Sequence, residues 1–162
     1  MIEDTPGTRT HLRTSLHVDR WVEEVAAGAP YRDLDALVRV ADRAARRLTS
    51  GEVTEALAQH PRIGELPSGA GVDAALSRRE QSAAQTEDPA LVAAMAHGNR
   101  AYEERFGRIF LIRAAGRSRP EVLAELERRL TLDDDAEVAE VAAQLREIAL
   151  LRLRTLFTEE TA

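Results

Sequence analysis

Residues 133–157 read DDDAEVAEVAAQLREIALLRLRTLF, and this stretch decides the fold class. Acidic residues begin it and arginines lie near its end, which suits the dipole of one long helix. Apolar residues repeat along it at three- and four-residue spacing, as in a helix with one buried face. That face is formed by Val138, Val141, Leu145 and Ile148. The next position on the same face is Arg152, which predicts a guanidinium that points inward.

The rest of the chain shows helical periodicity and helix-capping residues, with no strand-like alternation of useful length. Further helices are predicted at about 19–28, 34–48, 49–59, 77–85, 88–106 and 118–130. Only RIFLIRA, residues 108–114, suits an extended conformation. The sequence therefore predicts an all-α fold, a single-domain bundle of about six to eight helices.

The ends and the middle of the chain suggest where order is weak. Residues 1–15 are polar and contain Pro6 and Gly7, so they are predicted to form a flexible tail before a helical domain at 16–158. The glycine-rich segment PSGAGVDAA, residues 67–75, is also predicted to be flexible. No repeat and no long linker divides the chain.

Composition narrows the function classes. The 162 residues are 44% hydrophobic and 31% charged, with a net charge of −6 and no cysteine. An acidic balance argues against nucleic acid or an anionic membrane as a partner. The absence of cysteine excludes disulfides and thiolate sites, and it suits a reducing compartment. With no signal-peptide core and no apolar stretch of membrane-spanning length, the predicted location is the cytoplasm.

The loop HPRIGE, residues 60–65, interrupts the helical pattern with a histidine directly before a proline. Pro61 ends the preceding helix and restricts His60 to an extended conformation, so the pair can aim an imidazole. A simpler interpretation is a loop histidine that donates to a backbone carbonyl. Arg62 and Glu65 are most simply solvated charges. The spacing of the four histidines predicts no metal site.

Other polar residues also allow two interpretations. Ser77 and Glu80 have the spacing of a helix-starting capping box, which explains both without chemistry. Asn99 lies within the apolar face of the helix at 88–106, where it could line a site or cap a neighbouring helix. Arg152 could bind a ligand, or it could extend along the surface to bring its charge to water.

Together these segments resemble one family. Five motifs occur in the order and spacing of the OHCU decarboxylases: HPRIGE, SRREQ, NRAYEERFG with FLI after it, GRSRPEVLAELERRL and REIALLRLRTL. Trp21–Val22 also resembles the family's N-terminal part. The resemblance extends over about residues 16–158. OHCU is 2-oxo-4-hydroxy-4-carboxy-5-ureidoimidazoline, whose decarboxylation gives (S)-allantoin during uric acid degradation.

The resemblance implies an all-α carboxy-lyase, a homodimer, that uses no cofactor and no metal. It places the catalytic positions on His60 and Glu80. It places the substrate-binding positions on Pro61, Ser77, Gln81, Ile112 and Arg152. Two departures, Arg108 after the FG pair and Ala29 before Pro30, bear on the pocket rim or the dimer contact.

Three other functions compete with this one. A non-catalytic helical module could use the same residues to bind a ureide or a partner protein. A DNA-binding regulator would need a basic recognition helix, which the acidic balance disfavours. A structural bundle without a ligand is the remaining alternative.

Overall fold

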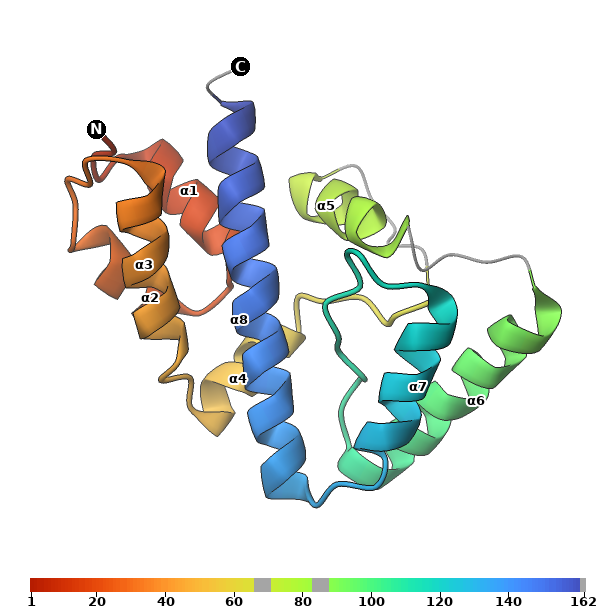
Figure 1. The fold of residues 1–162 in the computed structure, drawn as a ribbon. Coiled ribbons are helices and arrows are strands. Elements are labelled where there is room, and N and C mark those ends of the chain that lie inside the picture. The colour runs from red at the N-terminus through yellow and green to blue at the C-terminus, as the bar shows by residue number, and fades with distance from the viewer. Residues whose placement is uncertain (66–70, 83–87, 161–162) are drawn as a thin grey trace. The chain divides into compact units, whose positions relative to one another are not determined.

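The computed structural model describes residues 1–65, 71–82 and 88–160, and these contain eight helices and no sheet. The helices are α1 (Pro6–Ser15), α2 (Asp19–Ala26), α3 (Leu34–Ala45), α4 (Ser50–Leu57), α5 (Val72–Gln81), α6 (Pro89–Phe106), α7 (Arg119–Arg129) and α8 (Asp134–Glu159). Figure 1 shows them in chain order. The predicted all-α class and helix number are confirmed. None of the described helices has the length and apolar character needed to span a bilayer.

The chain divides into two compact units. The first unit comprises residues 1–59 and 142–162, and the second comprises residues 60–141. The boundary falls within α8, after Val141. Each unit has its own buried residues.

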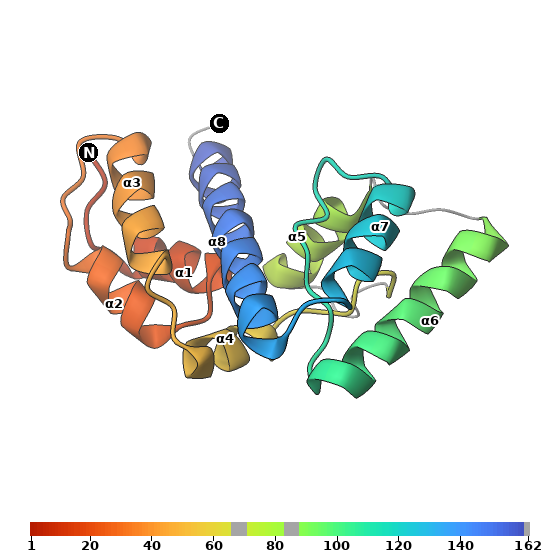
Figure 2. The same ribbon diagram turned by 60° about the horizontal axis from the view of Figure 1, so that its bottom comes forward.

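In the first unit, α1, α2 and α3 pack in sequence, and Figure 2 shows the three helices from a second direction. Trp21 is fully buried on α2, and its indole nitrogen donates to the carbonyl of Ala41 on α3 at 3.0 Å. Beyond residue 141, α8 contributes Leu145 and Leu153 to the buried residues. Local capping agrees with the prediction, because Thr49 and Glu52 form the capping box that begins α4.

The prediction of a flexible tail at residues 1–15 is wrong. Thr5 caps α1 by accepting from the Thr8 amide at 3.1 Å, and Pro6 occupies the first helical turn, where it has no hydrogen bond to lose. Leu12 is fully buried, so α1 belongs to the packed part of the first unit. The helix was missed because its first turn is polar and only its last turns carry apolar residues.

In the second unit, α6 and α7 lie side by side in both views (Figures 1 and 2). Gly98 of α6 permits this approach, since a methyl group at that position would lie 2.4 Å from Cδ2 of Leu126 on α7. The unit's apolar cluster comprises Ile63, Met95, Tyr102, Phe110, Ile112, Ala114, Val122 and Leu126. Residues 108–114 contribute to it as an irregular buried segment without a described strand partner.

Both predicted boundaries of α6 and the predicted start of α7 are confirmed. Asp88 caps α6, and Gly107 ends it with a φ of 67°. Ser118 and Glu121 form the capping box of α7. In the segment predicted to be flexible, α5 begins at Val72, and residues 67–70 lie outside the described residues, as do 83–85 of the helix predicted at 77–85.

Candidate active site

The HPRIGE loop, residues 60–65, is held in place through its backbone. The amide of Gly64 donates to Oε1 of Gln81 on α5 at 3.0 Å. The side-chain amide of Asn99 on α6 donates to the carbonyl of Ile63 at 3.0 Å. Ile63 is itself buried in the apolar cluster of the second unit. The loop that carries His60 and Pro61 is therefore anchored by two helices of its own unit.

Arg62 and Glu65 were predicted to be solvated loop charges, and Arg62 instead bridges to α6. Its guanidinium pairs with Glu103, one contact being 3.1 Å, and lies 3.9 Å from Glu65. The Arg62 guanidinium lowers the pKa of the Glu103 carboxyl, chiefly through the hydrogen bond. Because Arg62 is nearly half exposed, this pair fixes geometry more than it adds stability.

The face of α5 that meets the loop carries three predicted site residues. Ser77 and Gln81 are four residues apart and both buried, so they lie on one face of the helix. Glu80, three residues after Ser77, is half-buried. Because the Gln81 side chain reaches Gly64, this face is turned toward the HPRIGE loop. Both Ser77 and Glu80 form interactions within the chain.

The capping-box interpretation of Ser77 and Glu80 is wrong. Helix α5 begins at Val72, with Gly71 as its N-cap, so both residues lie in its second half. The spacing that suggested a cap is also the spacing of neighbours on one helical face, and the sequence alone did not separate the two. Neither side chain is therefore committed to starting the helix.

Ile112 is buried in the apolar cluster of the same unit, together with Ile63 of the loop. It lies in the irregular segment at 108–114, which carries backbone groups that no sheet satisfies. Arg129 of α7 supplies one donor, because its Nη1 bonds the Leu111 carbonyl at 2.6 Å. The residue before Ile112 is therefore held by a fully buried guanidinium.

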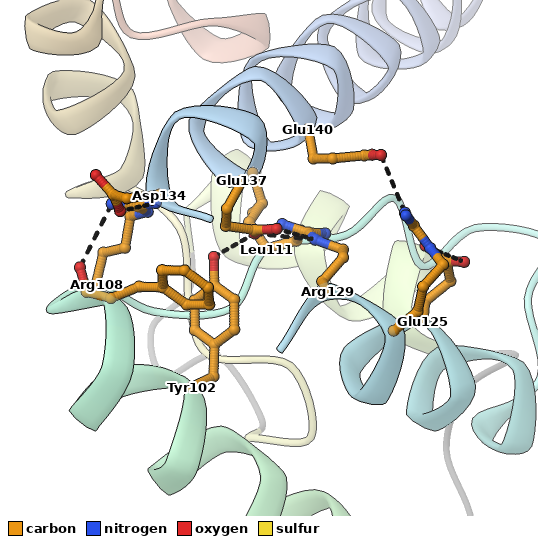
Figure 3. Close-up of polar contacts among 10 residues, drawn as sticks. Tyr102, Arg108, Leu111, Glu125, Arg129, Asp134, Glu137 and Glu140 are labelled. Carbon is orange, nitrogen blue, oxygen red and sulfur yellow. Dashed lines mark hydrogen bonds and ion pairs between the residues drawn. The ribbon is translucent and has the colours of Figure 1, made fainter. Parts of the chain in front are cut away.

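Figure 3 shows the buried polar network to which Arg129 belongs. Glu137 of α8 accepts from Nε of Arg129 at 2.9 Å and from the Tyr102 hydroxyl. All three side chains are fully buried. Burial is the main cause that raises the pKa of Tyr102 above its ordinary value, and the bond to Glu137 adds to it. The network joins α6, α7 and the start of α8 behind the 108–114 segment.

Sequence reasoning missed Arg129 and Glu137. A signal existed for Glu137, because it lies four residues before Val141 and so extends the apolar face of α8 by one turn. Arg129 has the same signal, because it lies three residues after Leu126 and seven after Val122 on the buried face of α7.

Arg152 belongs to the first unit, where it is buried as predicted. Its Nη1 donates to the Thr14 carbonyl of α1 at 3.2 Å, among other interactions within the chain. The other predicted site residues belong to the second unit: His60, Pro61, Ser77, Glu80, Gln81 and Ile112. Within that unit, Ile63 of the HPRIGE loop and Ile112 share one apolar cluster, and Gln81 of the α5 face bonds Gly64, the residue after Ile63.

Asn99 bonds the HPRIGE loop and does not cap a neighbouring helix. Its Nδ2 holds the Ile63 carbonyl, while its buried Oδ1 has no hydrogen-bond partner among residues 1–65, 71–82 and 88–160. An oxygen in this state is suited to accept an N–H group. Within the same described residues, no cluster of three or more metal-ligating side chains is arranged to hold an ion.

Residues 4–154 match the model of the OHCU decarboxylase family. The chain belongs to this family. Its members are carboxy-lyases. Three of the family motifs contribute residues to the apolar cluster of the second unit: HPRIGE, NRAYEERFG with FLI, and GRSRPEVLAELERRL.

Individual relatives agree with the OHCU decarboxylase assignment. The chain is 28% identical over 144 residues to the uric acid degradation bifunctional protein TTL of Arabidopsis thaliana, a match that covers 86% of this chain and 44% of that protein. The chain thus spans less than half the length of this plant relative.

Two solved structures share the fold. A crystal structure of OHCU decarboxylase in the presence of (S)-allantoin matches with a TM-score of 0.75 and 25% identity, covering 90% of this chain and 96% of that one. A structure of (S)-allantoin synthase matches with a TM-score of 0.66 and 18% identity, covering 94% and 51%, and supports the fold alone.

One departure from the OHCU decarboxylase pattern has a structural role here. Arg108, where the family commonly has an aromatic residue, bonds Asp134 of α8 at 2.9 Å and lies over the ring of Phe106. It therefore closes the end of α6 against the start of α8, and its charge is compensated.

Proposed function

We propose that this protein decarboxylates OHCU to (S)-allantoin without a cofactor, as one step of uric acid degradation. The observation that carries the proposal is the hydrogen bond between Gly64 and Gln81, which joins two family motifs, the HPRIGE loop and the SRREQ face. Such an arrangement supports a site in which one loop supplies the imidazole and one helix supplies polar groups that face it.

The chemistry of the substrate supports a reaction without a cofactor. The departing carboxylate is attached to a ring carbon that also bears a hydroxyl and adjoins a C=N carbon. When the bond to the carboxylate breaks, its electron pair forms a double bond to the neighbouring carbon, and the C=N pair moves to nitrogen. That nitrogen takes up a proton. The neighbouring carbon then gains a proton while the hydroxyl loses one, which gives the carbonyl of allantoin.

His60 is suited to these proton transfers because an imidazole titrates near neutral pH. We assign to it the removal of the hydroxyl proton and the delivery of a proton to one face of the planar intermediate. Delivery from one face would produce a single enantiomer. Pro61 limits the conformations of His60, so less ordering is needed when the substrate binds.

Glu80 is proposed to hydrogen-bond His60, which would select one tautomer and favour the protonated imidazole. Ser77 and Gln81 on the same helix, together with Ile112 of the apolar cluster, are proposed to contact the ring and the ureido group. Gln81 already orders the loop through Gly64, so its proposed role includes positioning.

Arg152 is proposed to bind the substrate through its planar fork of donors, which matches urea-like carbonyl groups. We also propose a homodimer located in the cytoplasm, in keeping with the family resemblance and the absence of cysteine. Sedimentation equilibrium of the purified chain should give twice the monomer mass. A single monomeric species at assay concentrations would refute the dimer.

The reaction is tested with freshly generated OHCU, made by oxidising urate and hydrolysing the product, while circular dichroism follows (S)-allantoin. The wild-type chain should accelerate its appearance. His60→Ala should lower kcat by roughly a hundredfold or more, the usual contribution of a positioned acid or base. His97→Ala is the matched control, because His97 is an exposed histidine on α6.

Glu80→Gln should lower kcat strongly while the protein stays folded, because Glu80 does not cap α5. The exposed Glu104 on α6 provides the control variant Glu104→Gln, which should keep its rate. A His60→Ala variant that runs at the wild-type rate, or a wild-type chain that does not accelerate the reaction, would refute the proposed function.

A further inference from the structure

Arg119, at the start of α7, is only 7% exposed and lies against the HPRIGE loop. A methyl group built on Gly64 would lie 3.0 Å from its Nη1. Gly64 has a φ of 89°, a conformation that favours glycine, and its lack of a side chain leaves the guanidinium room beside the loop. The Arg119 guanidinium is therefore next to Gly64, whose amide donates to Gln81.

The guanidinium has no compensating acid among the residues that the structure describes. Its buried Nε has no hydrogen-bond partner there, and burial is the cause that lowers the pKa of Arg119. Burying a cation without an anion costs free energy. A favourable interaction elsewhere must offset this cost.

Four acidic residues of the loop, α6 and α7 interact with groups other than Arg119. Glu103 pairs with Arg62, which also attracts Glu65. Glu121 accepts from the Ser118 amide at 2.6 Å as part of the capping box. Glu125 pairs with Arg128 on the next turn of α7 at 3.0 Å.

The position of Arg119 within its helix strengthens the attraction for an anion. It is the first residue of an 11-residue helix, where the backbone dipole is positive and favours negative charge. Proteins usually place acids there. The buried side chain and the helix end thus act in the same direction, toward a negatively charged ligand at the loop.

We propose that Arg119 forms a carboxylate subsite that binds the carboxylate of the substrate. The inference rests on the proposed function and deepens it. The subsite distinguishes substrate from product, because (S)-allantoin has lost the carboxylate and cannot make this contact. Since the negative charge leaves the carboxylate as CO2 forms, the contact is stronger before the reaction than in its transition state. It therefore contributes to binding and not to the chemical step.

Arg119→Gln tests the subsite. Loss of a charge-assisted contact should raise KM roughly ten- to a hundredfold, while kcat stays the same or rises. Inhibition by allantoate, a ureide that carries a carboxylate, should weaken by the same factor, and inhibition by neutral (S)-allantoin should not change. Arg119→Lys, which keeps the charge but loses the fork, should be intermediate. Arg100→Gln, at an exposed arginine of α6, is the control and should match the wild type.

Thermal unfolding separates this role from a structural one. Removing an uncompensated buried cation should leave Tm unchanged or raise it, whereas loss of a structural contact would lower it. An unchanged KM, an equal loss of affinity for allantoate and allantoin, or a fall in kcat alone would overturn the subsite. If the wild type shows no turnover, the proposed function fails, and the subsite is still tested by calorimetric binding of allantoate to wild type and variant.

Discussion

The buried pair of Arg129 and Glu137 permits a quantitative test of how the Ile112 segment is held. Both side chains are fully buried, and Arg129 also bonds the Leu111 carbonyl. Arg129→Met would leave the Glu137 carboxylate buried with the Tyr102 hydroxyl as its remaining described partner. Glu137→Met would leave the guanidinium buried without its carboxylate. Breaking a buried pair on one side typically costs about 3–5 kcal/mol.

In a chain of this size, about 1 kcal/mol corresponds to roughly 2–4 °C in Tm, so each single variant should lose roughly 6–20 °C. The double variant removes both charges and leaves apolar side chains of similar length. It should be no less stable than the worse single variant, because neither charge is then uncompensated. It should stay below the wild type, since the Leu111 carbonyl and the Tyr102 hydroxyl lose partners at about 1–3 kcal/mol each.

The assay is urea unfolding followed by helical circular dichroism, arranged as a double-mutant cycle. Arg128→Met is the matched control: the adjacent residue on α7 pairs at the surface with Glu125 and Glu140, and it is 46% exposed. Its loss should cost about 1 kcal/mol or less. KM measured on the double variant should rise, because the Leu111–Ile112 segment has lost its anchor. Additive losses in the double variant would refute the coupling of Arg129 with Glu137.

Further predictions concern packing, pH and metals. Gly98→Ala should cost about 1–2 kcal/mol in urea unfolding, because its methyl group would clash with Leu126. Gly51→Ala should gain about 0.5 kcal/mol or more, because its methyl group would make only an ordinary van der Waals contact with Thr49 at 3.9 Å. Arg20 lowers the pKa of Glu52 to about 2, so Glu52 stabilises the fold above pH 4.5 and this stabilisation is lost as pH falls toward 2. Because Arg20 is 37% exposed, solvent screening reduces this stabilisation to about 1–2 kcal/mol. Glu52→Gln should remove this part of the pH dependence of unfolding. An unchanged pH profile in the variant would contradict the role of Glu52. Chelation should leave decarboxylation intact, and inhibition reversed by a divalent metal would refute a reaction without a cofactor.

The sequence predicts helices well where capping residues and apolar periodicity agree. Asp88 and Gly107 mark the ends of α6, and Ser118 marks the start of α7, because these signals act within one turn of the chain. The errors come where one local pattern has two physical meanings. Ser77 and Glu80 satisfy the spacing of a cap and of a shared helical face, and α1 lacks an apolar first turn.

The candidate site was less accessible to sequence reasoning, because its polar residues are held by partners far along the chain. Gln81 is fixed by the Gly64 amide, and Asn99 by the Ile63 carbonyl. Both partners are backbone groups, which leave no trace in side-chain periodicity. The inward position of Arg152 was predictable because it continues the apolar face of α8.

Arg119 shows how a departure from local rules can indicate function. A cation at a helix N-terminus opposes the dipole, and a buried cation without a described acid opposes solvation, so the residue departs from two preferences at once. The adjacent Ser118 and Glu121 obey the capping rule, which shows that the helix start itself is well formed. The unfavourable terms are therefore confined to one side chain. Sites where local preferences fail while the surrounding structure satisfies them are the sites where a ligand is expected to supply the missing group. At Arg119 that group is an anion beside Gly64.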